Sequence, residues 1–488
     1  MSPPPALTLL TVDYWALGPV MGLTVGLLVL LLLELLPAGP RSPRAAIVSL
    51  LTLAAAAACV LVVRDDRRML FDGMFIHDGI TVFFTLLFVA ITAIGVLLSW
   101  DYVRRTNINH GEFYALMLGA TLGMVIMAAS HDLITIFLGL ELMSLSLYVL
   151  VGFRRNNLES NEAALKYFLL GAFASGFLLY GIALLYGATG TTNLQKMAAF
   201  LAYSPLAGNT LLIAGGLLVI VGLAFKVAAV PFHMWTPDAY QGAPTSVTAY
   251  MSAGAKAAGF AALVRLMLTV LPNVEANWTA VLTGIAILTM TVGNVTALFQ
   301  TNLKRMLAYS SIAHAGYVLV AIVAGGTAGA AAALFYLAVY SFMNLGAFGI
   351  LTLLGREGEE RVLVSDLAGL GFKHPALGLA MSVFMISLGG IPPTAGFMGK
   401  VYVFSVALNT GHLPLVIVGV LNSVVSIFYY LRVTVAMYME EPRGESTPMS
   451  WAVPSTVALA ASLLLTLWWG VQAHALLIQA QRSVTGLL

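Results

Sequence analysis

The chain has 488 residues, of which 60% are hydrophobic and only 9% are charged, whereas soluble domains carry about 25% charged residues. This composition excludes a water-soluble fold, and the formal net charge of +2 comes with no basic run long enough to bind nucleic acid. The single cysteine, Cys59, cannot by itself form a disulfide, an iron–sulfur site or a zinc site. No P-loop or strand–GxGxxG–helix unit is present either, so any redox cofactor is expected on a partner.

Apolar segments of about 20 residues recur along the chain, and each can cross a hydrocarbon core of about 30 Å. They lack the alternation of an outer-membrane barrel, so an all-α polytopic membrane protein is predicted. The start, MSPPPALTLLTVDYWALG, lacks the basic region of a cleavable signal, so the first apolar segment is predicted to be a retained helix. Charge, glycine and proline bound about 14 transmembrane helices, near 15–36, 44–63, 78–99, 112–130, 132–152, 161–187, 211–234, 243–271, 277–299, 304–324, 328–354, 375–411, 413–438 and 450–476.

Lysine and arginine in the short loops predict the orientation. With the N-terminus outside, the asymmetry of these residues favours both termini on the periplasmic side of a bacterial inner membrane, although three arginines follow the second helix. The adjacent Asp65 and Asp66 partly offset that cluster. The predicted inner loops carry Arg41, Arg44, Arg104, Arg105, Arg154, Arg155, Lys304, Arg305, Arg356, Arg361, Lys373 and Arg443, and the outer side carries Arg64, Arg67, Arg68, Lys196 and Arg482.

Two predicted helices contain proline well inside their length, at Pro231 in FKVAAVPFHMW and, 161 residues later, at Pro392 in SLGGIPPTAGFMGK. Each proline falls in the fourth helix of a five-helix block, and a five-helix unit repeated in tandem must reverse its orientation. Inverted repeats with interrupted helices in matching positions are typical of ion-translocating folds. The alternative is that each proline merely kinks a helix. The predicted division is an N-terminal three-helix segment at 1–111, a first repeat at 112–271, a second, inverted repeat at 272–440 and a C-terminal helix at 441–488.

Four ionisable residues lie at depths where hydropathy alone would place leucine: Glu141, Lys226, Lys256 and Lys400. An ionised side chain in the middle of the bilayer costs about 2.5–3.5 kcal/mol, so each needs a reason. A buried Lys–Glu pair could simply tie helices together, but one glutamate cannot neutralise three lysines. Burial favours the neutral amine and a nearby carboxylate favours the ammonium, so movement of Glu141 could make Lys226 hold or release a proton. This set predicts a proton pump element.

Four further polar residues are weaker candidates: Glu162, Lys166, His233 and His314. Glu162 and Lys166 are spaced i,i+4 on one helix face, which fits either a proton path or an ordinary interfacial salt bridge. His233 and His314 lie in or beside interrupted apolar stretches and could relay protons, or could merely be hydrogen-bonded. Arg265, late in its helix, is expected to extend its side chain outward to the interface.

Several stretches together resemble the antiporter-like membrane subunits of NADH:quinone oxidoreductase (respiratory complex I). They are SHDLITIFLGLELMSLSLYVLVGF, EAALKYFLLGAFASGFLLYGIALLYGATGT, FKVAAVPFHMWTPDAYQGAPTSVTAYMSAGAKAAGFAAL, NLKRMLAYSSIAHAGYVLV and SLGGIPPTAGFMGKVYVF. Within that family WTPDAYQGAPT, followed by AKAAGF and a lysine at position 400, resembles subunit N, whereas subunits L and M usually read WLPDAH or WLPDAM. The long C-terminal lateral helix of subunit L is also missing.

The resemblance implies roles for these residues. Glu141 matches the glutamate of the fifth helix, Lys226 the lysine of the seventh, Lys256 the central relay lysine and Lys400 the exit-path residue. Glu162, Lys166, His233 and His314 match family positions of lesser certainty. The implied function is proton translocation driven by quinone reduction elsewhere in the complex.

The resemblance also implies partners and cofactors. The expected partners are other membrane-arm subunits, including related antiporter-like subunits, and the lipid bilayer, with no nucleic acid. The expected cofactors of the complex are NADH, FMN, iron–sulfur clusters and quinone, with none in this chain. Three alternatives stay open: a subunit of a multisubunit sodium/proton antiporter, the equivalent subunit of the ferredoxin-linked photosynthetic complex, and a structural membrane anchor.

Overall fold

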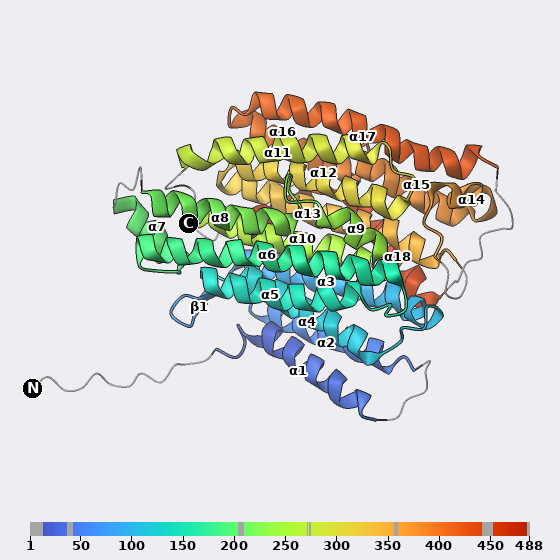
Figure 1. Cartoon of the computed structure of the whole chain (residues 1–488), viewed down its shortest axis with the longest axis horizontal. Coiled ribbons are helices and arrows are strands. Elements are labelled where there is room, and N and C mark those ends of the chain that lie inside the picture. The colour runs from blue at the N-terminus through green and yellow to red at the C-terminus, as the bar shows by residue number, and fades with distance from the viewer. Residues whose placement is uncertain are drawn as a thin grey trace, which may run out of the picture.

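A computed structural model describes residues 13–36, 42–203, 209–270, 272, 275–355, 360–441 and 452–485. The long helices lie side by side with their axes roughly aligned in one elongated bundle (Figure 1). Arg41, Arg356 and Arg443, which contributed to the predicted orientation, lie outside the described residues.

The elements in chain order are α1 (Gly18–Glu34), α2 (Arg44–Val62), β1 (Arg68–Leu70), β2 (Phe75–His77), α3 (Gly79–Arg105), α4 (Gly111–Ala129), α5 (Leu133–Val151), α6 (Leu158–Thr189), α7 (Leu194–Tyr203), α8 (Thr210–Val227), α9 (Trp235–Gly242), α10 (Thr245–Thr269), α11 (Glu275–Ala297), α12 (Leu303–Ala324), α13 (Gly326–Leu353), α14 (Leu370–Lys373), α15 (Pro375–Gly389), α16 (Ala395–Asn409), α17 (Leu413–Met439), α18 (Val453–Val471) and α19 (Ala473–Thr485). Strands β1 and β2 form a small antiparallel hairpin.

Within the described residues, twelve helices are long and apolar enough to cross a membrane, and α1 and α15 are shorter apolar helices. Each of the fourteen predicted segments overlaps with one of these helices. The prediction of an all-α polytopic membrane protein is therefore confirmed.

Helices α10, α12 and α13 form the centre of the bundle, with nearly all of their residues buried. Small residues let neighbouring helices approach closely, as is usual in membrane bundles. Gly123 of α4 is an example, because a Cβ there would lie 2.6 Å from the Gly139 carbonyl oxygen of α5. Outer helices such as α6 and α17 expose large apolar side chains, including Phe173 and Phe428, as a lipid-facing surface requires.

Two of the predicted helices are broken, as the prolines predicted. Helix α8 ends at Val227, passes through Ala228 in the left-handed conformation (φ 62°) and resumes as α9. Helix α15 ends at Gly389, passes through Gly390 (φ 79°) and resumes as α16. Proline cannot donate the backbone hydrogen bond that an uninterrupted helix needs. The two broken helices run in opposite directions along the bundle (Figure 1), whereas the division of the chain into four parts stays a prediction.

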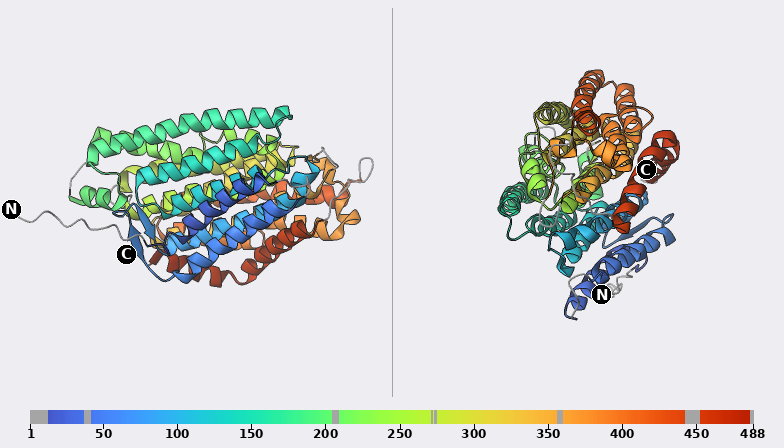
Figure 2. Two further views of the ribbon diagram at one scale, coloured as in Figure 1. Left: turned by 90° about the horizontal axis from the view of Figure 1, so that it is seen from below. Right: turned by 90° about the vertical axis from the view of Figure 1, so that its right-hand side faces the viewer.

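The two ends of the bundle differ in charge. One end of the bundle, where α3, α5 and α13 end and α4, α6, α10 and α12 begin, is called the basic end. The opposite end is called the terminal end. Residues near both termini lie at the terminal end (Figure 2), where Ala16 packs with Phe75 and Gly79 of α3 approaches Ser483 of α19. The described basic residues of the predicted inner loops all flank helix ends at the basic end: Arg44, Arg104, Arg105, Arg154, Arg155, Lys304, Arg305, Arg361 and Lys373.

The expectation that Arg265 extends outward is wrong. Its side chain is only 1% exposed and forms an ion pair with Asp78, the N-cap of α3. The Ala128 carbonyl and the Thr81 hydroxyl accept its remaining hydrogen bonds. Because Asp78 neutralises the Arg265 guanidinium inside the bundle, the side chain need not extend to the interface. Hydropathy could not predict this partner, because it carries no information about which residues meet.

Candidate functional site

Lys226 lies at the last turn of α8, just before the first break, and is 3% exposed. Its ammonium donates to Ser144 Oγ of α5 at 2.8 Å and to the Tyr167 hydroxyl of α6 at 3.4 Å. It also lies 5.6 Å from the centre of the Tyr167 ring, within the range of a cation–π contact. Lys226 is thus buried among neutral acceptors.

Glu141 lies one turn before Ser144 on α5 and accepts a hydrogen bond from Ser175 of α6. The carboxylate acts electrostatically on Lys226, although no ion pair within 4.0 Å joins the two side chains. Ser144, Ser175 and Lys226 line a cavity of about 10 Å³ between them, and about this volume is needed to hold one water molecule. Glu141 itself does not line this cavity; its hydrogen-bond partner Ser175 does.

Helix α10 connects the first break to the centre of the bundle. A Cβ on Gly259 would lie 3.6 Å from Lys226 Cβ, so the two helices are in close contact at this point. Lys256, one turn earlier on the same helix, is 3% exposed and donates to the hydroxyl of Ser311 on α12 at 2.6 Å, and also to its carbonyl. No carboxylate forms an ion pair with Lys256 among the described residues.

His314 lies one turn beyond Ser311 on α12 and is 2% exposed. Its two ring nitrogens are within hydrogen-bond distance of two tyrosine hydroxyls, Nδ1 at 2.8 Å from Tyr336 and Nε2 at 3.1 Å from Tyr430. The ring centre of Tyr340 lies 5.1 Å from that of His314 and 5.9 Å from the Lys256 ammonium. Tyr340 therefore bridges Lys256 and His314.

Lys400 lies on α16, just beyond the second break, and is 4% exposed. It donates to the carbonyls of Leu388 and Gly389 at 3.3 and 2.8 Å, and to Ser423 Oγ at 2.8 Å. The last carbonyls of a helix have no partner within it and carry the negative end of its dipole. The break in α15 thus provides acceptors for a buried ammonium. Tyr317, whose ring is 5.0 Å from Lys400 and 5.6 Å from the His314 ring, bridges these two residues.

The structure brings Lys256, His314 and Lys400 into one buried row, and Lys226 packs against Gly259, one turn along α10 from Lys256. The sequence predicted these four residues and Glu141 individually. It did not indicate the tyrosines that join them, because tyrosine is common in membrane helices and only the packing selects these: Tyr167, Tyr317, Tyr336, Tyr340 and Tyr430.

Glu162 and Lys166 lie apart from this row, near the basic end. They form an ion pair of 2.6 Å, and Lys166 also binds Asp238 of α9 at 2.9 Å. Arg305 of α12 binds the second oxygen of Asp238 at 2.6 Å. Glu162 and Lys166 keep 64% and 45% of their side chains exposed, and the group lines an open polar hollow of about 240 Å³. The interfacial salt bridge foreseen for this pair is present.

His233 lies in the break between α8 and α9, as expected from its position after Pro231. Its ring Nδ1 is buried and has no hydrogen-bond partner among the described residues. It makes none of the contacts that join Lys256, His314 and Lys400. Its predicted role in proton transfer stays untested.

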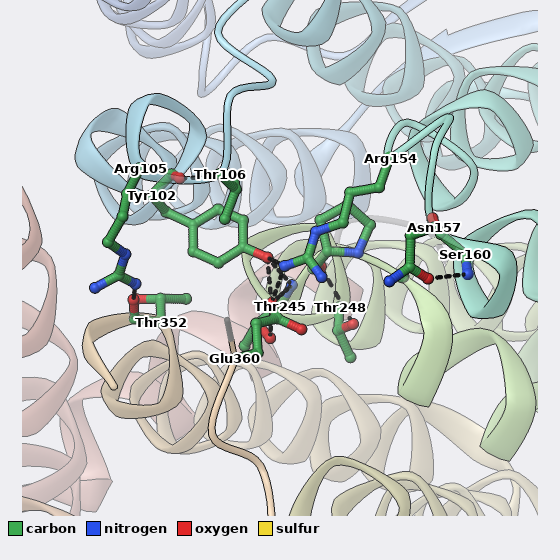
Figure 3. Close-up of polar contacts among 12 residues, drawn as sticks. Tyr102, Arg105, Thr106, Arg154, Asn157, Ser160, Thr245, Thr248, Thr352 and Glu360 are labelled. Atoms are coloured by element: carbon green, nitrogen blue, oxygen red, sulfur yellow. Dashed lines mark hydrogen bonds and ion pairs between the residues drawn. The ribbon is translucent and has the colours of Figure 1, made fainter. Parts of the chain in front are cut away.

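A second buried charge cluster, centred on Glu360, was missed by the sequence analysis (Figure 3). Its carboxylate forms an ion pair of 2.5 Å with Arg154 and lies 3.5 Å from the Lys304 ammonium. It also accepts hydrogen bonds from the Tyr102 hydroxyl and, at 2.7 Å, from the Thr245 hydroxyl. Burial raises the pKa of Glu360, but Lys304 and Arg154 outweigh it and lower the pKa to about 2. A lone glutamate in a charged loop gave no signal, because its partners come from four other parts of the chain.

The family described as NADH:quinone oxidoreductase/Mrp antiporter, transmembrane, matches residues 130–426, more than half of the chain. The chain belongs to this family. The matched region holds both broken helices and the buried row, with Glu141. Among the described residues, no group of three or more His, Cys, Asp or Glu side chains could hold a metal ion.

Several relatives of this chain are described as subunit N of NADH-quinone oxidoreductase. The NADH-quinone oxidoreductase subunit N of Trichlorobacter lovleyi is 52% identical over 414 residues, which cover 85% of each chain. A chain in respiratory complex I from Thermus thermophilus is 38% identical with a TM-score of 0.81, covering 95% of this chain and 100% of that one. These relatives confirm the resemblance to subunit N. A chain of the Mrp complex from Dietzia has a TM-score of 0.84 at 21% identity, over 98% of each chain, which establishes a shared fold alone.

Proposed function

We propose that this chain is the proton-translocating, subunit-N-type membrane subunit of an NADH:quinone oxidoreductase. The observation that carries the proposal is the row of buried cationic and aromatic side chains from Lys256 through His314 to Lys400, which begins beside Lys226 and Glu141. An ionised side chain buried in a membrane is costly, and such residues mark functional sites that include ion pathways and proton relays. The high identity to subunit N chains supports the assignment to this complex over a sodium/proton antiporter.

A proton would move along the row by transfer from one protonated side chain to its neutral neighbour. Lys226, Lys256 and Lys400 rest on hydroxyl and carbonyl acceptors, so the neutral amine leaves no carboxylate unpaired. Burial favours that neutral form, whereas the charge of Glu141 favours the ammonium at Lys226. A change in the distance between Glu141 and Lys226 would therefore send a proton along α10 towards Lys256. The weaker candidates Glu162, Lys166 and His233 would act before this step.

The test uses membrane vesicles that contain the assembled complex, with quinone reduction and proton uptake measured in parallel. Glu141→Gln, Lys226→Met, Lys256→Met and Lys400→Met should each lower donor-driven pumping by about tenfold or more, which corresponds to roughly 1.4 kcal/mol in the barrier. The matched control is Lys196→Gln, because Lys196 is 58% exposed and pairs with Asp72 outside the row. It should pump like the unaltered complex.

Full pumping by assembled Lys256→Met and Lys400→Met complexes would overturn the proposal for the row. Donor-independent exchange of sodium for protons by the isolated assembly would instead favour the antiporter alternative. A complex that reduces quinone normally without pumping in these variants would support the proposal directly.

The proposal extends to partners, cofactors and location. The partners are other membrane-arm subunits, and NADH, FMN, iron–sulfur clusters and quinone are bound by other chains of the complex. The proposal also includes two inverted repeats, at 112–271 and 272–440, each of which contains one of the two breaks. It places the basic end on the cytoplasmic side of a bacterial inner membrane. Labelling of single cysteines introduced as Lys373→Cys and Lys196→Cys in a Cys59→Ser background tests the orientation, because the first should react only from the inner side.

A further inference from the structure

Glu360 holds a fixed negative charge at the basic end of the bundle. Its side chain is 15% exposed, and Lys304, beside it, is not exposed at all. Among the residues that the structure describes, the Lys304 ammonium has one other acceptor, the Ala243 carbonyl at 2.6 Å. Removal of the partner of a buried charge is far more costly than loss of a surface pair. Glu360 is therefore the group that neutralises Lys304.

Glu360 also anchors the start of α10, the helix that carries Lys256. The backbone N–H of Thr245 donates to Glu360 Oε1 at 3.2 Å, and the Thr245 hydroxyl donates to the same oxygen at 2.7 Å. The first N–H groups of a helix lack partners within the helix, and a carboxylate at this end interacts favourably with the helix dipole. Tyr102 of α3 joins the same contact through its hydroxyl (Figure 3).

A buried polar column runs from this anchor to Lys256. Thr245, Thr248, Ser252 and Lys256 are spaced three or four residues apart, so they lie on one face of α10. All four are at most 3% exposed. Asn344 of α13 faces the column and donates to Ser252 Oγ at 2.6 Å.

The column contains one acceptor whose hydrogen-bonding capacity is unused. The Oδ1 atom of Asn344 is fully buried and accepts no hydrogen bond among the described residues. Buried polar atoms in proteins are nearly always bonded to protein or to water. Water bound to this oxygen would extend the line of hydroxyl groups towards Lys256.

We propose that Glu360 is a positioning residue for proton entry, which neutralises Lys304 and anchors α10 so that the column of Thr245, Thr248, Ser252 and Asn344 conducts protons from the basic end to Lys256. The inference rests on the proposed function. Glu360 itself does not carry the proton, because it is held ionised by Lys304 and Arg154. Its effect on Lys256 is electrostatic and geometric.

The role of the Glu360 charge is tested by measuring the pH profile of pumping in the assembled complex with Glu360→Gln alone and with the double variant Glu360→Gln, Lys304→Gln. Thr245 is eleven residues from Lys256, about 17 Å along the helix axis. An unpaired Lys304 charge at about this distance, with an effective dielectric constant of about 20, should move the alkaline limb of the pumping profile down by roughly 0.7 pH unit. The sign follows because an added positive charge makes proton uptake by Lys256 harder.

The double variant removes both charges and should return the pH profile to that of the unaltered complex. Glu112→Gln is the matched control, because Glu112 is an exposed carboxylate in the first turn of α4 at the same end. It should change nothing. Asn344→Leu keeps a similar volume and should slow pumping about tenfold without a shift in pH.

An unshifted pH profile in Glu360→Gln, or a shift that Lys304→Gln fails to reverse, would overturn the role of Glu360. Normal pumping by Asn344→Leu would overturn the column. If Glu360→Gln does not assemble, the double variant decides, because an assembled double variant with an altered profile contradicts the proposal. Failure of the proposed function is distinguishable, since Lys256→Met would then pump normally.

Discussion

Arg265 and Asp78 form a two-pronged ion pair in the interior, with Nη1 2.5 Å from Oδ2 and Nη2 2.7 Å from Oδ1. Replacement of Asp78 by Asn leaves the guanidinium buried without its counter-charge, which should cost about 3–5 kcal/mol of stability. Assembly after graded heating, followed by size-exclusion chromatography, measures this loss. Asp65→Asn is the control, since Asp65 pairs with Arg64 on the exposed surface and its loss should not be detectable. Equal behaviour of the two variants would contradict the prediction.

Tyr336→Phe and Tyr430→Phe each remove one of the two hydroxyls bonded to His314. Loss of one buried hydrogen bond should cost about 1–3 kcal/mol, which leaves the fold intact. Proton transfer through the ring should slow about tenfold, because the tautomer and orientation of the imidazole are no longer held. Parallel assays of quinone reduction and pumping check this. Normal pumping in both variants would remove His314 from the path.

Gly390→Ala should disable Lys400 without replacing it. Gly390 has φ 79°, and an added Cβ would lie 2.7 Å from Lys400 Cδ and 2.9 Å from its Nζ. The side chain must move away from the carbonyls of α15, so pumping should fall nearly as far as in Lys400→Met. The left-handed conformation adds about 1–2 kcal/mol of destabilisation. A variant that assembles and pumps normally would contradict the proposed position of Lys400.

Ala228→Gly provides the opposite change at the first break. Ala228 is a non-glycine residue with φ 62° at the C-cap of α8. Glycine adopts this conformation without the clash of a Cβ, so stability should rise by about 1 kcal/mol. A higher midpoint of thermal disassembly, with unchanged pumping, is the expected result. A lower midpoint would show that the Ala228 methyl group contributes packing that outweighs its strain.

Lys166→Gln should lower pumping by less than about fivefold, because pairs as exposed as this one contribute about 0–1 kcal/mol. Asp238 keeps its bond to Arg305 at 2.6 Å, and Glu162, which loses its ion pair, is 64% exposed and can be solvated. Initial pumping rates of the variant and the unaltered complex, compared at low and high ionic strength, measure this decrease. A loss as large as that of Lys226→Met would place Lys166 on the proton path.

The cluster at Glu360 predicts an acid-dependent stability. The pKa of Glu360 is about 2 in the folded chain, below the ordinary 4.5, because Lys304 and Arg154 outweigh the effect of burial. A depressed folded-state pKa contributes stability above the ordinary pKa and loses it as the pH falls towards the folded value. The stability difference between the unaltered chain and Glu360→Gln should therefore be constant above pH 4.5 and shrink between pH 4.5 and about 2. A difference that does not change over this range would contradict the ion pairs.

The sequence by itself determined the membrane class, the fourteen apolar segments, the two broken helices and the presence of the ionisable residues Glu141, Lys226, Lys256 and Lys400 within apolar segments. These are local properties: a run of apolar residues sets a span, and a proline interrupts its helix wherever the rest of the chain lies. Only the tertiary structure decided which side chains meet. Arg265 finds Asp78 across 187 positions and Tyr102 finds Glu360 across 258, and the tyrosines join the lysines through contacts between different helices. Hydropathy gives the depth of a residue in the membrane but not the helix face that it meets, and the partner on that face decides whether a buried charge is neutralised or left to exchange a proton.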